Sequence, residues 1–390
     1  MTDNNANALL PPGIADVLAP DAAFEAAQLE HLIAFFAGYG YERVKPPLIE
    51  FEETLLSGLG TAVTQDTFRL MDPVSQRMLA VRADITPQMA RIATSRLAGH
   101  ARPMRLSYAG QIIRVSGSQA RPERQFAQVG AELIGADVPA ADAEVIVMAA
   151  AALKSLGVPD ISVDLAMPTL VPAFCAPLAL APADDEAVRE ALDHKDAAAI
   201  KALAPALGNA AAETLAAMLT ASGHADETMA ELAGLDLGPA AAAERDALQA
   251  VIDAIRARDP ELVLTVDAVE NRGFEYHTGV TCSFFSRGVR GELGRGGRYQ
   301  AGLPSAESDG EPATGLTLFM DTILKALPKP TAQQRAYLPA GGDVGAAERL
   351  RGEGWSVVSA LAPAGDDTAE ARRLACTHLV DGGKLVEIQK

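Results

Sequence analysis

Cysteine is scarce in this sequence: Cys175, Cys282 and Cys376 are the only three among 390 residues, and they lie far apart. An odd number of widely separated cysteines argues against a disulfide framework, and no two have the spacing of metal ligands. The six histidines also show no paired spacing. The sequence therefore predicts three small buried thiols and no metal site.

Basic residues and long apolar runs are also in short supply. Lys and Arg number 33 against 51 Asp and Glu, a formal charge of −18, which disfavours nucleic acid as a partner. No apolar run is long enough to cross a bilayer, and the first ten residues lack the basic start of a secretory signal. The 49% of hydrophobic residues suffice for a substantial core. Together these features lead us to expect a soluble cytoplasmic protein.

The pattern along the chain alternates between helix and strand signals. Apolar residues at helical spacing predict a helix from residue 21 to Gly38, and Thr86 before Pro87 predicts a capped helix that stops near Gly99. A further helix is expected at 142–156. Strands are expected at 41–44, 68–71, 78–81, 106–115, 125–134, 161–165, 262–266 and 275–285.

Two segments differ from this pattern. Residues 183–259 are rich in Ala and nearly free of aromatics, and we interpret them as a helical insertion in a catalytic-type domain of residues 1–182 and 260–328. Residues 329–390 form a short C-terminal α/β appendage, with a helix at 346–351 and strands at 355–359 and 385–388. The expected fold class is α+β.

Polar residues at strand ends mark a candidate pocket. Asp84 and Thr86 lie at a strand end just before a helix, where a carboxylate can pair with an ammonium group, although a cap with a solvated Asp explains them equally simply. Alternation places Gln128, Gly130 and Glu132 on one strand face, where they either leave room for a small ligand or face solvent.

Two later segments add polar candidates, 272–279 (RGFEYHTG) and the glycine-rich 294–299 (GRGGRY). The second is not a dinucleotide fingerprint, because Tyr299 occupies the place of the last glycine, and paired glycines more simply indicate close backbone approach. The sequence contains no nucleophile-elbow serine and no Walker-type phosphate loop. The residues alone thus indicate a pocket for a small zwitterion, with no catalytic residue and no cofactor.

Taken in order, these segments resemble the catalytic domain of class II histidyl-tRNA synthetases across roughly residues 12–324. Residues 40–50 (GYERVKPPLIE) look like motif 1, the dimer-forming segment, and 113–130 looks like motif 2. Residues 272–277 resemble the histidine motif of that synthetase, and 296–299 its next signature. The resemblance implies an antiparallel sheet flanked by helices and a class II-like dimer interface.

The resemblance also implies a histidine-binding site. Asp84 replaces a glutamate that holds the ammonium group, and Glu132 suits an imidazole N–H. His277 stands where a tyrosine is expected, which affects side-chain selectivity. The residues that match histidine contacts are Asp84, Thr86, Arg114, Gln128, Glu132, Arg272, Tyr276, His277 and Tyr299.

The nucleotide-binding positions differ from the family pattern. Arg114 matches the arginine that contacts the α-phosphate, but Ser116 replaces a glutamate and Thr322 replaces the ATP-binding arginine. A threonine lacks the charge and the planar fork of arginine, so we expect triphosphate binding to weaken steeply. The loss of such a charged contact removes about 2–4 kcal/mol of catalytic stabilisation. The tail after motif 3 is also short for an anticodon-binding domain.

With these departures the sequence resembles the regulatory subunits of ATP phosphoribosyltransferase, which are paralogues of the synthetase that act in histidine biosynthesis. That resemblance implies a non-catalytic chain in a hetero-oligomer with the short-form catalytic subunit, sensing histidine and not binding tRNA. A degenerate but working histidyl-tRNA synthetase is the enzyme alternative. A freestanding amino-acid-binding regulator of another enzyme is the third.

Overall fold

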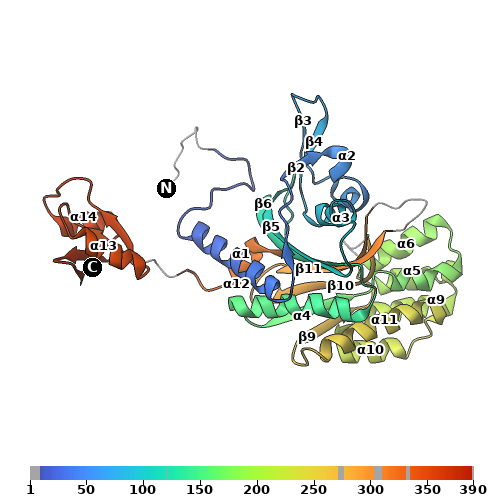
Figure 1. Ribbon diagram of the computed structural model, residues 1–390. Helices are drawn as coiled ribbons and strands as arrows, with labels where there is room; N and C mark the ends of the chain where they lie inside the picture. Colours follow the sequence, from blue (N-terminus) through green and yellow to red (C-terminus); the bar gives the residue numbers. More distant parts are fainter. Residues whose placement is uncertain (1–8, 120, 271–275, 303–309, 331–333, 389–390) are drawn as a thin grey trace. The chain divides into compact units, whose positions relative to one another are not determined.

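The structure is a computed structural model that describes residues 9–119, 121–270, 276–302, 310–330 and 334–388. Its internal contacts divide the chain into two units, Met1–Pro328 and Lys329–Lys390, each of which is described by itself (Figure 1). None of the helices in the described ranges is long and apolar enough to cross a membrane.

The first unit contains a nine-stranded sheet in the order β1-β5-β6-β12-β11-β10-β7-β9-β8. Its six central strands pair antiparallel, whereas β1 and β9 pair parallel to β5 and β7. The strands are β1 (Glu42–Arg43), β5 (Met104–Ile113), β6 (Gln125–Ile134), β7 (Ile161–Ala166), β8 (Ser222–His224), β9 (Val263–Asp267), β10 (His277–Ser286), β11 (Gly294–Ala301) and β12 (Glu311–Phe319).

A second, three-stranded sheet has the order β2-β4-β3, with β2 (Ile49–Phe51), β3 (Arg69–Met71) and β4 (Met78–Val81). Figure 1 shows α1 and α4 on one face of the large sheet and α3 with the small sheet on the other. The helices outside the Ala-rich segment are α1 (Asp21–Gly38), α2 (Glu52–Leu55), the 3₁₀ helix η2 (Gly58–Val63), α3 (Thr86–Thr94), α4 (Pro139–Leu156), α5 (Leu170–Cys175), η3 (Ala176–Leu178) and α12 (Met320–Ala326).

Strand β6 separates two hydrophobic cores, because alternate side chains point to opposite faces. Ala127, Val129 and Leu133 pack into the larger core with α1 and α4, whereas Phe126 and Ile134 belong to the smaller core under α3. The predicted alternation is confirmed. The solvent-facing alternative for Gln128 and Glu132 is wrong, because both side chains are fully buried.

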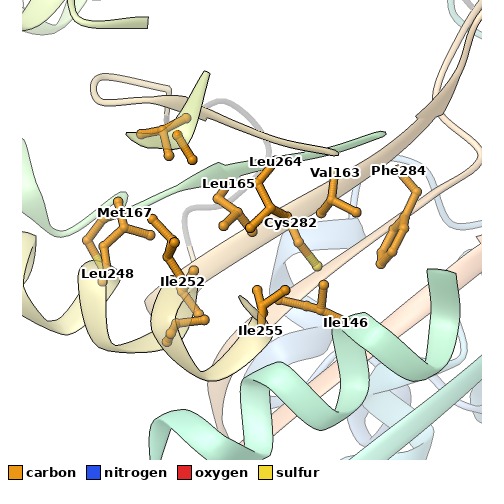
Figure 2. Close-up of a cluster of buried hydrophobic side chains, with 14 of the residues drawn as sticks. Ile146, Val163, Leu165, Met167, Leu248, Ile252, Ile255, Leu264, Cys282 and Phe284 are labelled. Atoms are coloured by element: carbon orange, nitrogen blue, oxygen red, sulfur yellow. The ribbon is translucent and has the colours of Figure 1, made fainter. Parts of the chain in front are cut away.

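The Ala-rich segment forms helices, as predicted, and one short strand, β8, that the sequence analysis missed. Its helices are α6 (Pro182–Asp193), α7 (Ala197–Ala202), α8 (Ala204–Leu207), α9 (Asn209–Thr220), α10 (Ala225–Ala233) and α11 (Gly238–Arg256). The predicted apolar face of α11 packs on the large sheet: Figure 2 shows Leu248, Ile252 and Ile255 beside Leu165 and Cys282. Each such side chain contributes about 1.5–3 kcal/mol when fully buried. The segment shares this core with the sheet, so its status as an insertion remains a prediction.

The second unit is a four-stranded sheet in the order β14-β13-β15-β16, parallel except for the last pair. Its helices α13 and α14 contribute to separate small cores that contain different residues of β13. The elements are β13 (Arg335–Leu338), α13 (Val344–Gly352), β14 (Ser356–Ser359), α14 (Asp367–Arg373), β15 (His378–Asp381) and β16 (Lys384–Glu387). The helix and two strands expected in this tail are present, while β13, α14 and β15 were missed.

Candidate ligand site

A cavity of about 300 Å³ lies on the α3 side of the large sheet. Strands β6, β11 and β12 form its floor, and the start of α3, the end of β5 and the helix η2 form its sides. The lining includes Leu59, Asp66, Asp84, Thr86, Arg114, Glu132, Tyr276, His277, Arg295, Gly296, Tyr299, Gly315, Thr317 and Phe319. Seven of the nine predicted binding residues are therefore brought to one cavity, from segments far apart in the sequence.

Asp84 is held in place at one side of this cavity by its neighbours. One carboxylate oxygen accepts the backbone N–H of Thr86 at 2.8 Å, and the other accepts the side-chain amide of Gln128 at 2.9 Å. The prediction that Thr86 caps its helix is wrong, since Ile85 occupies the cap position and Thr86 is the first residue of α3. That helix also ends at Thr94, earlier than predicted.

Gln128 lies behind Asp84 and does not line the cavity. Its side chain is fully buried, and its carbonyl oxygen accepts the N–H of Ile85 at 3.1 Å while its NH₂ group donates to Asp84. The expectation of a direct ligand contact for Gln128 is therefore revised: this geometry makes it a positioning residue for Asp84.

Glu132 is the second carboxyl group of the cavity and is fully buried. It accepts the hydroxyl of Tyr299 at 2.8 Å and that of Tyr108 at 3.4 Å. Burial raises the pKa of Glu132 to about 8, and the charge of Asp84 adds to the rise, although the tyrosine and Thr86 hydrogen bonds oppose it. A carboxyl group poised in this way can exchange a proton or an N–H hydrogen bond with a ligand near neutral pH.

Two glycines give these side chains their space. A Cβ on Gly315 would lie 1.6 Å from a Glu132 carboxylate oxygen, so only glycine permits Glu132 at this point of β12. Gly130 was predicted to leave room for a ligand, and this is wrong. A Cβ there would lie 2.2 Å from the Tyr108 ring, so Tyr108 occupies the room above Gly130.

A hydroxyl cluster was missed by the sequence analysis. The Tyr108 hydroxyl lies 2.6 Å from that of Thr317 and 3.2 Å from that of Thr86, and both Tyr108 and Thr86 hydrogen-bond Glu132. Tyr108 and Thr317 sit on β5 and β12, which are not neighbours in the chain or in the sheet, so no local pattern signalled their meeting. Burial raises the pKa of Tyr108, which keeps its proton available for donation.

Aromatic rings close the cavity at the β10–β11 edge. Tyr276 and His277 stack with ring centroids 4.0 Å apart, and Tyr276 meets Tyr299 edge to face at 6.3 Å. His277 is buried and also borders a second cavity of about 270 Å³ beneath α5 and α6. The predicted residue Arg272 lies outside the described residues.

Arg114 and Arg295 form the basic side of the cavity. Nε of Arg114 donates one long hydrogen bond, 3.4 Å, to the carbonyl of Ala83. Burial lowers the pKa of Arg114; the negative charge of Asp84 opposes this effect, and the charges of Arg295 and Arg121 add to it. Within the described ranges no carboxylate forms an ion pair with Arg114, which leaves this guanidinium available to an anionic ligand group. The sequence analysis did not single out Arg295, because it interpreted the glycines around it only as a sign of close backbone approach.

Beside the cavity lies an aromatic shelf, which we define as the rings of Phe126 and Phe319, 6.1 Å apart and edge to face. The guanidinium of Arg121 covers it, 3.9 Å from the centre of Phe319 and 4.9 Å from that of Phe126. Nη2 of Arg121 lies 3.3 Å from the hydroxyl of Thr322. Arg121, from the loop between β5 and β6, thus brings a guanidinium beside Thr322, which the sequence analysis did not foresee.

Other candidate chemistry is limited. The three cysteines are buried and free, as predicted, and burial raises the pKa of each thiol. Among the residues that the structure describes, no group of three or more His, Cys, Asp or Glu side chains is placed to hold a metal ion.

The architecture is that of a class II synthetase-type domain, and the comparisons agree with this. The histidyl-tRNA synthetase family model matches residues 13–323. The histidyl-tRNA synthetase of Nostoc superposes with a TM-score of 0.77 at 16% identity, covering 98% of this chain and 97% of that one. The predicted fold class is confirmed.

Closer relatives narrow the class to a family. The ATP phosphoribosyltransferase regulatory subunit of Paramagnetospirillum magneticum is 53% identical over the full length of both chains, and that of Rhodospirillum centenum is 51% identical over 98% of this chain and 97% of its own. A Bacillus halodurans structure described as a regulatory subunit/histidyl-tRNA synthetase has a TM-score of 0.80 at 24% identity, covering 94% and 96%. The chain belongs to the family of ATP phosphoribosyltransferase regulatory subunits, as the sequence analysis predicted.

Proposed function

We propose that this chain is a non-catalytic subunit that binds histidine and regulates the short-form catalytic subunit of ATP phosphoribosyltransferase. The observation that carries the proposal is one cavity with two carboxyl groups, Asp84 and Glu132, together with the guanidinium of Arg114, which forms no ion pair with any residue that the structure describes. Histidine carries an ammonium group, an imidazole N–H and a carboxylate, and each finds a complementary partner in this set.

The proposed roles follow from the contacts. Asp84, fixed by Gln128 and the Thr86 N–H, accepts the ligand ammonium. Glu132, fixed by Tyr108 and Tyr299, accepts an imidazole N–H, and the Tyr276–His277 stack covers the ring. Arg114 pairs with the carboxylate. Arg272, also assigned to this site by resemblance, stays a prediction.

Bond-making is not part of the proposed role. Ser116 and Thr322 replace residues that the resemblance assigns to ATP binding, and the guanidinium of Arg121 beside Thr322 is engaged with the aromatic shelf and with Asp321 at 3.0 Å. A charge already paired inside the chain has little to offer a triphosphate. These features favour ligand binding over adenylation.

Regulation requires that histidine prefer one state of an assembly, because tight binding without preference shifts no equilibrium. Relatives named as regulatory subunits support a complex with a catalytic partner. We propose a hetero-oligomer of this chain with the short-form enzyme, together with self-association through the motif 1 region. Histidine binding to this chain would then change the activity of the complex.

The test is calorimetric titration of the purified chain with L-histidine, followed by assay of the reconstituted complex with and without histidine. The matched variants are Asp84→Asn, which removes the ammonium partner, and Asp236→Asn, an exposed carboxylate in the helical segment. We expect Asp84→Asn to weaken binding by at least about tenfold and to blunt the histidine effect on the complex, with Asp236→Asn unchanged. No binding, or binding without any effect on the complex, would reject the sensing role. Histidine-dependent ATP–pyrophosphate exchange would instead support the synthetase alternative.

A further inference from the structure

Arg121 is the most firmly held arginine of the polar loop between β5 and β6. Nε donates to Asp321 at 3.0 Å, and Nη2 donates to the Thr322 hydroxyl at 3.3 Å and to the carbonyl of Glu292 at 3.4 Å. The side chains of Arg121 and Asp321 are only 12% and 9% exposed. A long flexible side chain held at this many points marks a fixed position and not a passing surface contact.

The place that Arg121 occupies is one in which a flat ligand group would otherwise stack. The two rings stand at 81° to each other, so a flat group can stack on only one of them, and the Arg121 guanidinium lies nearer to Phe319, at 3.9 Å, than to Phe126, at 4.9 Å. A planar cation and a planar heteroaromatic ring compete for this same ring face. Phe319 belongs to this shelf and also lines the amino-acid cavity. The shelf is therefore next to the bound amino acid, and Arg121 covers it.

Another cavity, of about 290 Å³, adjoins the candidate ligand cavity, and the two share Asp66, Arg114 and Arg295 in their linings. Arg121 lines this adjoining cavity and not the ligand cavity. If Arg114 holds the carboxylate of a bound amino acid, a group attached to that carboxylate extends past Arg114 toward Arg121. The covered shelf then denies such a group its stacking surface.

We infer that Arg121 is a specificity-determining residue that restricts the site to free amino acids and excludes derivatives with a planar ring beyond the carboxylate. This inference rests on the proposed histidine site and deepens it. The Arg121 guanidinium takes the place of the ligand's planar ring. The amino-acid cavity thus stays accessible, whereas the aromatic shelf beside it is covered by the protein's own side chain.

The experiment compares Arg121→Ala with Arg290→Ala, an exposed arginine whose loss gives the same change of net charge. Removing Arg121 leaves Asp321 buried without its partner, so the double variant Arg121→Ala/Asp321→Ala is made as well and folding is checked by thermal melts. The ligands are L-histidine, L-histidine β-naphthylamide and adenosine. Binding is measured by calorimetry and by ligand-observed NMR.

We expect the naphthylamide to bind the wild-type chain and Arg290→Ala far more weakly than histidine does. It should bind both Arg121 variants at least about tenfold more tightly than it binds the wild type, as uncovered aromatic rings gain a stacked partner. Histidine affinity should change less than about threefold. Equal binding of naphthylamide and histidine to the wild type, or no gain in either folded Arg121 variant, would overturn the inference.

Adenosine separates this inference from the proposed function because it needs no amino-acid site. A saturation-transfer signal for adenosine in the Arg121 variants and not in the wild type supports the covered shelf even if histidine fails to bind. Absence of that signal in folded Arg121 variants that bind histidine counts against the shelf and leaves histidine sensing standing.

Discussion

The amino-acid cavity and the aromatic shelf lie next to each other on one face of the same sheet, but they are filled differently. The cavity leaves Asp84, Glu132 and Arg114 lining an empty space of about 300 Å³. The shelf is covered by Arg121, which is tied to Asp321. If the inference about Arg121 holds, a site can be changed by a side chain of the same protein that occupies it as well as by the loss of a contact residue.

Among substitutions at the ligand cavity, we expect Gly315→Ala to have the largest effect on histidine binding. The new methyl group would lie 1.6 Å from a Glu132 oxygen, so either Glu132 or the β6–β12 pairing must move. We expect loss of histidine binding by more than about 100-fold and a stability loss of about 1–3 kcal/mol, measured by calorimetry and denaturant unfolding. Gly99→Ala is the control, because nothing lies within 4 Å of a Cβ there. Unaltered binding in Gly315→Ala would mean that Glu132 is not a ligand contact.

A smaller effect, with a pH signature, is expected from Glu132→Gln. An amide cannot give up a proton to become a carboxylate acceptor for the imidazole N–H, so histidine binding should weaken by about 10–100-fold. The pKa of Glu132 is about 8 in the folded chain against 4.5 as its ordinary value, so between these pH values the unfolded chain releases a proton that the folded chain retains. Stability of the unliganded chain therefore falls as pH rises through this window, by up to about 1.4 kcal/mol per pH unit.

In Glu132→Gln this contribution to the pH slope disappears, and the variant becomes the more stable protein at the upper end of the window. Urea unfolding at several pH values measures the difference. The exposed Glu213 provides the control substitution to Gln. A wild-type slope matched by Glu132→Gln would show that Glu132 ionises normally.

The ligand cavity could be predicted from the sequence better than the aromatic shelf could. Alternation along β6 predicted correctly that Gln128 and Glu132 share a face, because a strand has a fixed period. It could not tell that Gln128 stops behind Asp84, since that depends on how α3 approaches the sheet. Nor could it find Tyr108 and Thr317, which meet only when β5 and β12 flank β6.

The shelf was the harder part to predict. Thr322 lacks the guanidinium of the arginine that it replaces, and from this the sequence analysis predicts a changed nucleotide site. The guanidinium beside Thr322 belongs to Arg121, which lies about 200 residues earlier in the chain, in a loop with no regular sequence pattern. Considering each substituted position separately does not reveal that a residue from a distant part of the chain occupies the same place in the structure. Residue periodicity therefore predicted the shared strand face of Gln128 and Glu132, and the family resemblance added Asp84 to the same site, but neither predicted that Arg121 covers the shelf.

A moderate effect is expected from Gln128→Ala, which tests positioning against direct contact. The substitution leaves the buried N–H of Ile85 and one oxygen of Asp84 without their partner, at a stability cost of about 1–3 kcal/mol. Histidine affinity should fall by about 3–10-fold. In an Asp84→Asn background the same change should add less than about twofold, because Gln128 acts through Asp84. Full additivity by calorimetry would restore Gln128 as a ligand contact.

The smallest expected effect is the most informative about the shelf. Ser116→Glu with Thr322→Arg reinstates the residue types that the resemblance assigns to ATP binding. With Arg121 in place, the new arginine meets a guanidinium already bound at that spot, so like charges oppose each other and the shelf stays covered. We expect no detectable ATP–pyrophosphate exchange and no gain in ATP affinity. The triple variant that also carries Arg121→Ala should bind ATP measurably, still without charging tRNA. Exchange activity in the double variant would show that the two lost contacts, and not the covered shelf, are what separates this chain from an adenylating enzyme.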